Sequence, residues 1–130
     1  MPELTRSNTK AFLERFSSFN DAVIRKVVVT YNAGGTRSVE VIVGCRDNEA
    51  AGDGWVSVRL IVEQVGDFCI ADDAKMSAQV ISEGVYICWL DGAVGIDFGH
   101  LADTPVDLSE LRTSRFFVIG NAAMWELYPY

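Results

Sequence analysis

The sequence contains few of the residues from which catalytic and metal sites are built. His100 is its one histidine, and the three cysteines, Cys45, Cys69 and Cys88, are widely spaced. There is no Cys-x-x-Cys or His-x-x-x-His pair of the kind that binds zinc. Gly-x-Ser-x-Gly and Gly-x-Gly-x-x-Gly motifs are also absent, which argues against the common hydrolase and dinucleotide sites. We therefore expect no cofactor, no metal ion and no catalytic residues.

Long apolar runs are also absent. The longest runs are a few residues, whereas a membrane-spanning helix needs about 20. Charged side chains at positions 3, 6, 10, 14 and 15 interrupt the apolar region that a secretory signal requires. An odd number of cysteines within apolar runs indicates reduced, buried thiols. These observations predict a cytoplasmic protein that does not associate with membranes.

Basic residues are scarce in the central part of the chain. The formal net charge is −7, and residues 47–110 contain 13 acidic side chains but only Arg59 and Lys75 as basic ones. This balance argues against nucleic acid as a partner and favours a basic protein. A merely solubilising acidic surface is the alternative. The candidate partner-binding residues are those of the two acidic clusters, Asp47, Glu49, Asp53, Asp72 and Asp73.

The abundant residues form short alternating apolar runs separated by turn-forming dipeptides. Asp91-Gly92 lies between apolar runs at residues 85–90 and 93–98 and suits a two-residue β-hairpin loop. Gly120-Asn121 has the same form, and it predicts another hairpin between residues 115–119 and 122–127. Further strands are predicted over residues 26–31, 37–43, 55–62, 68–70 and 79–81.

The strand pattern indicates the fold class. Residues 85–90 are apolar on both faces, which is typical of a central strand that is covered on both sides. Because the connections are short, neighbouring strands should be antiparallel. We predict an α+β, β-dominated fold, a mostly antiparallel meander, sandwich or roll of about eight or nine strands. One N-terminal amphipathic helix should pack on a sheet, and residues 1–130 should form a single domain.

The N-terminal helix is predicted over residues 10–19, with Asn8 or Thr9 as its cap. Phe12, Phe16 and Phe19 have the i, i+4, i+7 spacing of one helical face, so they should dock on the sheet. Nearer the C-terminus, Asp107 and Glu110 have the spacing of a capping box and predict a single helical turn.

Two other interpretations remain open. In the first, a small molecule binds, or a minor enzymatic reaction occurs, in a pocket between the helix and the sheet; the lining residues would be Phe12, Phe16, Tyr86, Trp89 and His100. In the second, the chain forms a homo-oligomer through a sheet edge or through its C-terminal aromatic residues, Trp125, Tyr128 and Tyr130.

Three segments together resemble small β-rich bacterial proteins. They are the Trp-initiated strand at residues 55–70, the Asp-Gly hairpin at residues 85–98, and the closing segment at residues 108–127 with its Leu-x-x-Leu-Arg-x-Ser-x-Phe run. The proteins that they resemble include uncharacterised families and immunity proteins of polymorphic-toxin systems. The resemblance implies a non-enzymatic inhibitor that binds a basic nuclease toxin, but it assigns no binding residue.

Overall fold

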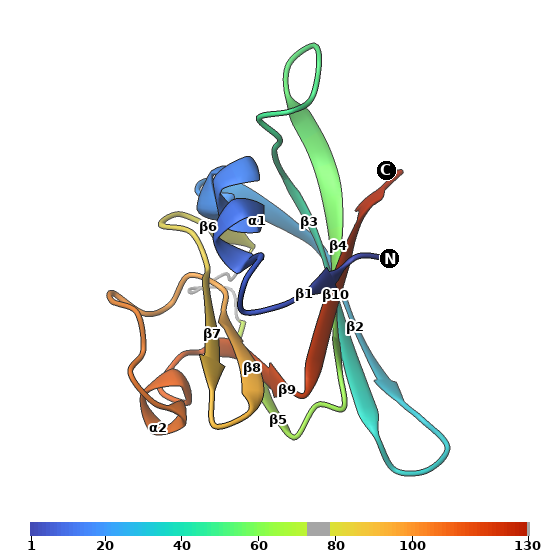
Figure 1. Ribbon diagram of the computed structural model, residues 1–130, viewed down its shortest axis with the longest axis vertical. Coiled ribbons are helices and arrows are strands. Elements are labelled where there is room, and N and C mark those ends of the chain that lie inside the picture. Colours follow the sequence, from blue (N-terminus) through green and yellow to red (C-terminus); the bar gives the residue numbers. More distant parts are fainter. Residues whose placement is uncertain (73–78, 130) are drawn as a thin grey trace.

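The computed structural model describes residues 1–72 and 79–129. Two helices, a 3₁₀ turn and ten strands are present in this part of the chain (Figure 1). In chain order they are β1 (Glu3–Leu4), α1 (Thr9–Arg15), η1 (Ser17–Phe19), β2 (Ala22–Tyr31), β3 (Arg37–Arg46), β4 (Trp55–Glu63), β5 (Asp67–Ile70), β6 (Val80–Ile81), β7 (Tyr86–Leu90), β8 (Ala93–Asp97), α2 (Leu108–Leu111), β9 (Phe116–Gly120) and β10 (Ala122–Tyr128).

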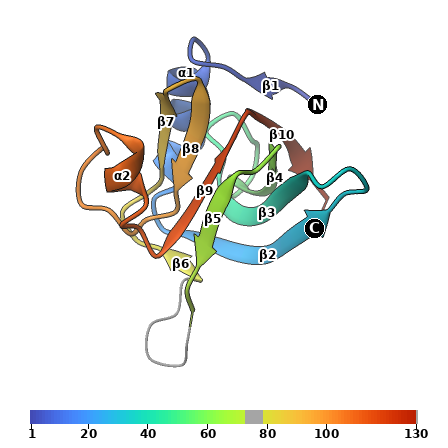
Figure 2. The ribbon, with the colours of Figure 1, turned by 90° about the horizontal axis from the view of Figure 1, so that it is seen from below.

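The strands form two antiparallel sheets. The large sheet has the order β1-β10-β4-β3-β2-β6, and the small sheet has the order β5-β9-β8-β7. Each neighbouring pair is antiparallel, which confirms the predicted β-dominated α+β class and its strand direction. Figures 1 and 2 show the small sheet beside α1 at one side of the strongly curved large sheet. No helix of the described residues is long and apolar enough to span a membrane.

Helix α1 packs its phenylalanines into the core, as predicted, but it is shorter than expected. Phe12, Phe16 and Phe19 are buried and contact one another, and Phe12 and Phe16 also contact Trp125 of β10; the ring centroids are between 5.1 and 5.6 Å apart. The α-helix ends at Arg15, because Ser17, Ser18 and Phe19 all have positive φ angles. This irregular turn places Phe16 and Phe19 in the same core although the helix has ended.

The predicted hairpin at Gly120-Asn121 is wrong, because the chain changes sheets there. Strand β9 pairs with β5 and β8 in the small sheet, whereas β10 pairs with β4 and β1 in the large sheet. A Cβ atom at Gly120 would lie 2.5 Å from the carbonyl oxygen of Glu63. Asn121 N donates a hydrogen bond to that same oxygen at 3.0 Å. Glycine is therefore required for close approach of two chain segments, not for a hairpin turn.

The hairpin at Asp91-Gly92 is confirmed, but its first strand is not central. Asp91 and Gly92 have φ angles of 51° and 76°, as a type I′ turn requires, and they connect β7 to β8. Strand β7 lies at the edge of the small sheet. Both of its faces are nevertheless apolar because α1 covers one of them and the segment at residues 98–107 covers the other. Trp89 Nε1 donates a hydrogen bond to Thr9 on α1, and Tyr86 Oη donates one to the Ala102 carbonyl.

Helix α2 covers the outer face of the small sheet. Leu111 is fully buried against Phe117 and Ile119. A Cβ atom at Gly95 would lie 2.2 Å from the Leu111 side chain, so the bare backbone of β8 makes room for the helix. Asp107 accepts a hydrogen bond from the Glu110 backbone N–H at 2.8 Å, which confirms the predicted cap.

Candidate functional site

Asp47, the first candidate partner-binding residue, is an internal ion-pair residue. Its side chain is 2% exposed, and both of its carboxylate oxygens lie 3.0 Å from the guanidinium nitrogens of Arg15. The hydrogen bonds from Arg15 hold the pKa of Asp47 below its usual range, against the opposing effect of burial. The same pairing raises the pKa of Arg15. This carboxylate is therefore not available to an external partner.

The rest of the loop at residues 47–54 is attached to the end of α1. Asn48 N donates to the Arg15 carbonyl at 2.9 Å, and Asn48 Nδ2 donates to the Glu14 carbonyl at 3.0 Å. These bonds satisfy carbonyls that the helix leaves free at its C-terminus. Glu49 is exposed but also pairs with Arg15 at 2.7 Å, and Asp53 is exposed and accepts a hydrogen bond from Trp55 N. Of the three acidic side chains in this loop, only Asp53 lacks a charged partner among the described residues.

The two predicted acidic clusters do not meet. Asp72 is exposed and follows β5, and Asp73 lies outside the described residues. Figures 1 and 2 place the loop at residues 47–54 and the end of β5 in different parts of the molecule. The five residues named from the sequence therefore do not form one surface patch among the described residues.

The five residues predicted to line a pocket between the helix and the sheet are not brought together. Phe16 is fully buried and Phe12 nearly so, both within the aromatic core. Trp89 faces α1, whereas Tyr86 lies on the opposite face of β7. His100 follows β8 on that opposite side, and its backbone N donates to Asp97. A hollow of about 290 Å³ does lie between α1 and Trp125 of β10, but Phe12 is the one predicted residue among those that line it.

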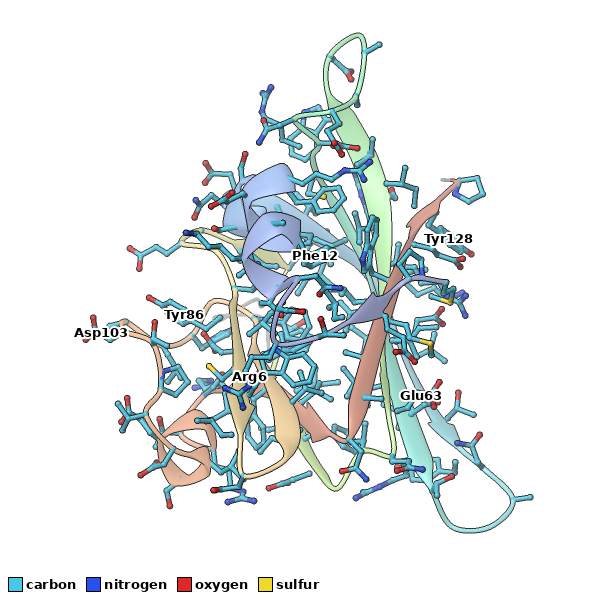
Figure 3. The ribbon with its side chains drawn as sticks, viewed as in Figure 1. Arg6, Phe12, Glu63, Tyr86, Asp103 and Tyr128 are labelled. Atoms are coloured by element: carbon cyan, nitrogen blue, oxygen red, sulfur yellow. The ribbon has the colours of Figure 1, made fainter. Side chains whose placement is uncertain are left out.

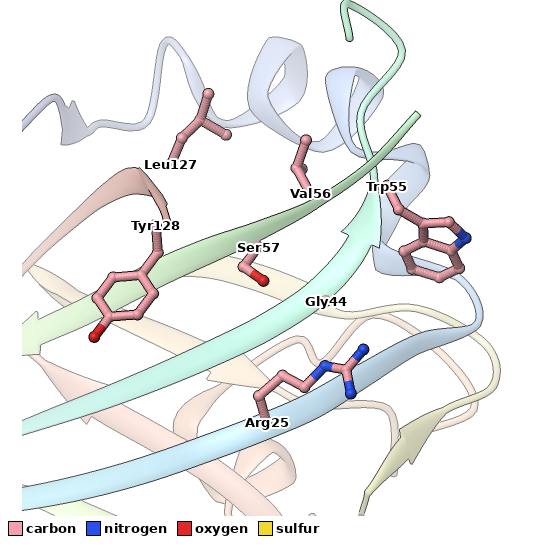
Figure 4. Close-up of a pocket in the computed structure, with 7 residues that line it drawn as sticks. All are labelled: Arg25, Gly44, Trp55, Val56, Ser57, Leu127 and Tyr128. Carbon is pink, nitrogen blue, oxygen red and sulfur yellow. The ribbon is translucent and has the colours of Figure 1, made fainter. Parts of the chain in front are cut away.

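A hollow that was not expected from the sequence lies on the outer face of the large sheet. It has a volume of about 400 Å³ and lies over β3, β4 and β10. Figure 4 shows the rings of Trp55 and Tyr128 at its two ends, with Ser57 and Gly44 between them and the Arg25 side chain to one side. Trp55 is half exposed. The alternation of apolar and polar residues along residues 55–62 predicts that Ser57 faces solvent. No local signal in the sequence indicates that Gly44 of β3 lies beside it.

Burial makes two of the three thiols poor nucleophiles. Cys45 and Cys88 are buried. Burial, together with the charge of Asp47, raises the pKa of the Cys45 thiol to about 12. Burial also raises the pKa of Cys88. Among the described residues, no group of three or more His, Cys, Asp or Glu side chains is placed to hold a metal ion.

A different set of carboxylates gathers on one side of the molecule. Its members come from the turn before β7, the β7–β8 hairpin, the loop after β8, and α2; they are Glu83, Asp91, Asp103, Asp107 and Glu110, which we call the acidic side. Figure 1 shows all of these elements on the left of the molecule, and Figure 3 shows Asp103 at the tip of its loop. None of the five is in an ion pair within the described part of the chain. The nearby Arg6 guanidinium donates to the Trp89 carbonyl instead.

A fully buried carboxylate, Asp97, holds the loop that carries part of the acidic side. Its Oδ1 accepts hydrogen bonds from His100 N at 3.1 Å and from Ser114 Oγ at 2.6 Å, and its Oδ2 accepts one from Leu101 N at 3.2 Å. These bonds tie the start of the segment between β8 and α2 to Ser114, which follows α2. At its outer end, Val106 is 75% exposed between acidic neighbours. The loop therefore presents an exposed apolar side chain between the carboxylates of Asp103 and Asp107 in the sequence.

Comparison with protein-family models, with curated proteins and with solved structures finds no match to this chain. The interpretation of the site therefore rests on its residues.

Proposed function

We propose that this chain is a non-enzymatic protein-binding module that binds a basic protein through its acidic side. The observation that carries the proposal is a set of five carboxylates without ion-pair partners in the described chain, around a loop held by buried Asp97. Negative charge of this density steers a cationic partner and accelerates its association. The exposed Val106 supplies apolar area at the centre of the surface.

A basic nuclease of the polymorphic-toxin type is the kind of partner that the sequence resemblance favours. A nuclease needs a cationic surface in order to bind phosphates. A protein that presents fixed carboxylates competes for that same surface. The proposed role is therefore inhibition by occupying a basic groove, with no chemical step on either side.

The test compares two triple variants that change the net charge equally. Asp103→Asn/Asp107→Asn/Glu110→Gln removes charge from the acidic side and keeps the cap of α2, because asparagine also caps helices. The control, Glu14→Gln/Asp21→Asn/Asp53→Asn, removes three charges elsewhere on the exposed surface. Each protein is used as bait in cell lysate, and captured basic proteins are then purified and titrated by calorimetry at two salt concentrations.

We expect a basic protein that binds the wild type and the control, and that binds the acidic-side variant at least tenfold more weakly with a smaller salt dependence. If both variants weaken binding equally, the net charge of the protein explains the effect and the position of the acidic side does not. Capture of no basic protein by the wild type would refute the proposal.

Small-molecule binding in the hollow on the outer face of the large sheet is a second candidate, favoured by its two aromatic ends and by the Arg25 guanidinium that lies against Gly44 between them. Aromatic rings at a wet, concave surface are suited to stacking on flat or sugar-like ligands. Titration with a fragment library should shift the NMR signals of the Gly44 amide and the Trp55 indole. Shifts that Trp55→Ala leaves unchanged would exclude this hollow as the site.

A further inference from the structure

Among the described residues, most of strand β2 lies at an open edge of the large sheet. Its short neighbour β6 pairs only with the start of β2, through Ala22 and Val23, and Ile24 N donates to the Gln79 carbonyl at 2.7 Å. From residue 26 to residue 31, no described strand lies on that side of β2. A bulge between Ile24 and Lys26 separates the covered part from the open part.

The hydrogen bonds of the β2–β3 hairpin show which backbone groups face this open edge. Asn32 N donates to the Thr36 carbonyl at 2.8 Å, so the pair at the loop is hydrogen-bonded. The next pair, Tyr31 and Arg37, does not exchange backbone hydrogen bonds, because the Arg37 carbonyl points to the other side of β3 and accepts a hydrogen bond from Val65 N. Along two antiparallel strands, hydrogen-bonded and non-hydrogen-bonded residue pairs alternate. The N–H and C=O groups of Tyr31, Val29 and Val27 therefore face the open edge.

Beyond Lys26, this edge lacks the features that usually prevent strand addition. Proteins protect open edges with proline, with lysines or inward-pointing charges, with bulges or with very short strands. Strand β2 has two of these, Lys26 and the bulge before it, and both lie at the start of the open part. Here Val27 and Val29 point inward and pack against the core, and no proline is present in β2. Tyr31, on the same face, is 73% exposed. The one charged side chain of the open part is Lys26, on the outer face.

A partly apolar groove runs beside the open edge, and Arg25, Lys26, Asp72 and Gln79 form its polar lining. It has a volume of about 260 Å³, and Ile24, Val27, Ile70 and Phe116 contribute its apolar lining. It lies between β2 of the large sheet and β5, which is the edge strand of the small sheet. A strand added to β2 would direct every second side chain towards this groove.

We infer that a second copy of this chain adds to β2 as an antiparallel strand, with Val29 of one copy opposite Val29 of the other. In this register, all three outward-facing residues form hydrogen-bonded pairs, because Tyr31 of each copy lies opposite Val27 of the other. The exposed Tyr31 ring then lies beside Val27 of the other copy, at the groove that Val27 lines. Aromatic and β-branched side chains form favourable cross-strand pairs.

The charges along the strand are compatible with this self-pairing. Lys26 lies opposite Asn32 of the other copy, and Val28 lies opposite Thr30, so no like charges meet. Pairing also leaves the acidic side exposed, because its elements lie on the opposite side of the molecule from the β2–β3 hairpin in Figure 1. The inference is therefore independent of the proposed function.

The first test uses sedimentation velocity over a dilution series, with Val29→Pro as the variant. The Val29 N–H faces the open edge, so proline there removes no bond between β2 and β3 and is tolerated at an edge strand. We expect a concentration-dependent dimer for the wild type and a folded monomer, by circular dichroism, for the variant. A wild type that stays monomeric up to its solubility limit would overturn the inference.

Hydrogen exchange keeps the test valid even if the proline variant misfolds. In the wild type, the amides of Val27, Val29 and Tyr31 should become protected as concentration rises, while those of Val28 and Thr30 should be protected throughout. Concentration-dependent protection of β10 alone, with none at β2, would place the dimer at the C-terminal aromatic residues and contradict the inference.

A charge pair tests the register. Asn32→Glu should place a carboxylate opposite each of the two copies of Lys26. Because each exposed ion pair contributes modestly, the dissociation constant of the dimer should fall by roughly fivefold. Asn32→Lys at the same position should weaken the dimer by a similar factor. Equal dissociation constants for the two variants would refute the Val29-centred register.

Discussion

Replacing the buried carboxylate of Asp97 should loosen the loop that forms the centre of the acidic side. Asp97→Asn keeps the shape of the side chain but exchanges one acceptor oxygen for an amide group. Because Oδ1 and Oδ2 both accept hydrogen bonds, the amide must face a donor, either Leu101 N–H or the pair from His100 and Ser114. At least one buried donor is therefore left without an acceptor.

The magnitude follows from these contacts. A lost hydrogen bond to a charged group costs about 1.5–3 kcal/mol, and the remaining bonds lose their charge assistance. We expect the free energy of unfolding to fall by about 3 kcal/mol, well above the typical loss of ~1 kcal/mol for a point substitution. Urea denaturation measures this value. Amide exchange should also accelerate between β8 and α2 more than in β3 or β4.

Asp107→Asn is the matched control, because its single bond to Glu110 N is retained by asparagine. This control substitution should lower the free energy of unfolding by less than about 0.5 kcal/mol. A loss below about 1 kcal/mol for Asp97→Asn, or unchanged exchange at His100 and Leu101, would refute the role assigned to the buried carboxylate. In the titration with a basic partner, Asp97→Asn should weaken binding although it changes no exposed charge.

Three further outcomes are expected. Asp47→Asn should lower the unfolding free energy by about 2 kcal/mol at pH 7. Since the hydrogen bonds from Arg15 lower the folded pKa of Asp47, this contribution is full above the unfolded pKa of about 4 and is lost as pH falls through the folded pKa; in urea melts, the wild type and the variant should converge in stability once the pH is below that folded pKa. Gly120→Ala should cost about 2–3 kcal/mol in the same assay, because its Cβ would overlap the Glu63 carbonyl, and wild-type stability would contradict the crossing geometry. Cys45, with a pKa of about 12, should resist alkylation at pH 8 until the chain unfolds, and rapid labelling of the native protein would show that the thiol is accessible.

Local signals in the sequence predict the parts of the fold that local chemistry controls. The Asp91-Gly92 turn, the strand at residues 55–62 and the Asp107 cap depend on neighbouring residues, and the structure contains all three. Gly120-Asn121 has an equally good hairpin pattern, but the partner of β10 is β4, which is distant in the sequence. Only a long-range contact, the approach to Glu63, explains that glycine.

In the candidate site too, the sequence reveals local features but not the contacts between distant residues. Asp47 is in a polar loop and was expected to be exposed, but Arg15 on α1 pairs with it from 32 residues away in the chain. The acidic side does have a sequence signal, since residues 76–111 contain no lysine or arginine. What the sequence does not reveal is which of these carboxylates is buried. Asp97 differs from Asp91 and Asp103 only through its partners in the folded chain.

The passage of the chain from the small sheet to the large sheet at Gly120 also determines how the chain can fold. All four strands of the small sheet lie, in the sequence, between β4 and its large-sheet neighbour β10. A growing chain that has emerged as far as β9 therefore holds β4 with one edge unpaired, and contacts of such long sequence separation form slowly. Folding should consequently be a late, all-or-none event, and truncated chains that lack β10 should aggregate through the exposed edge of β4.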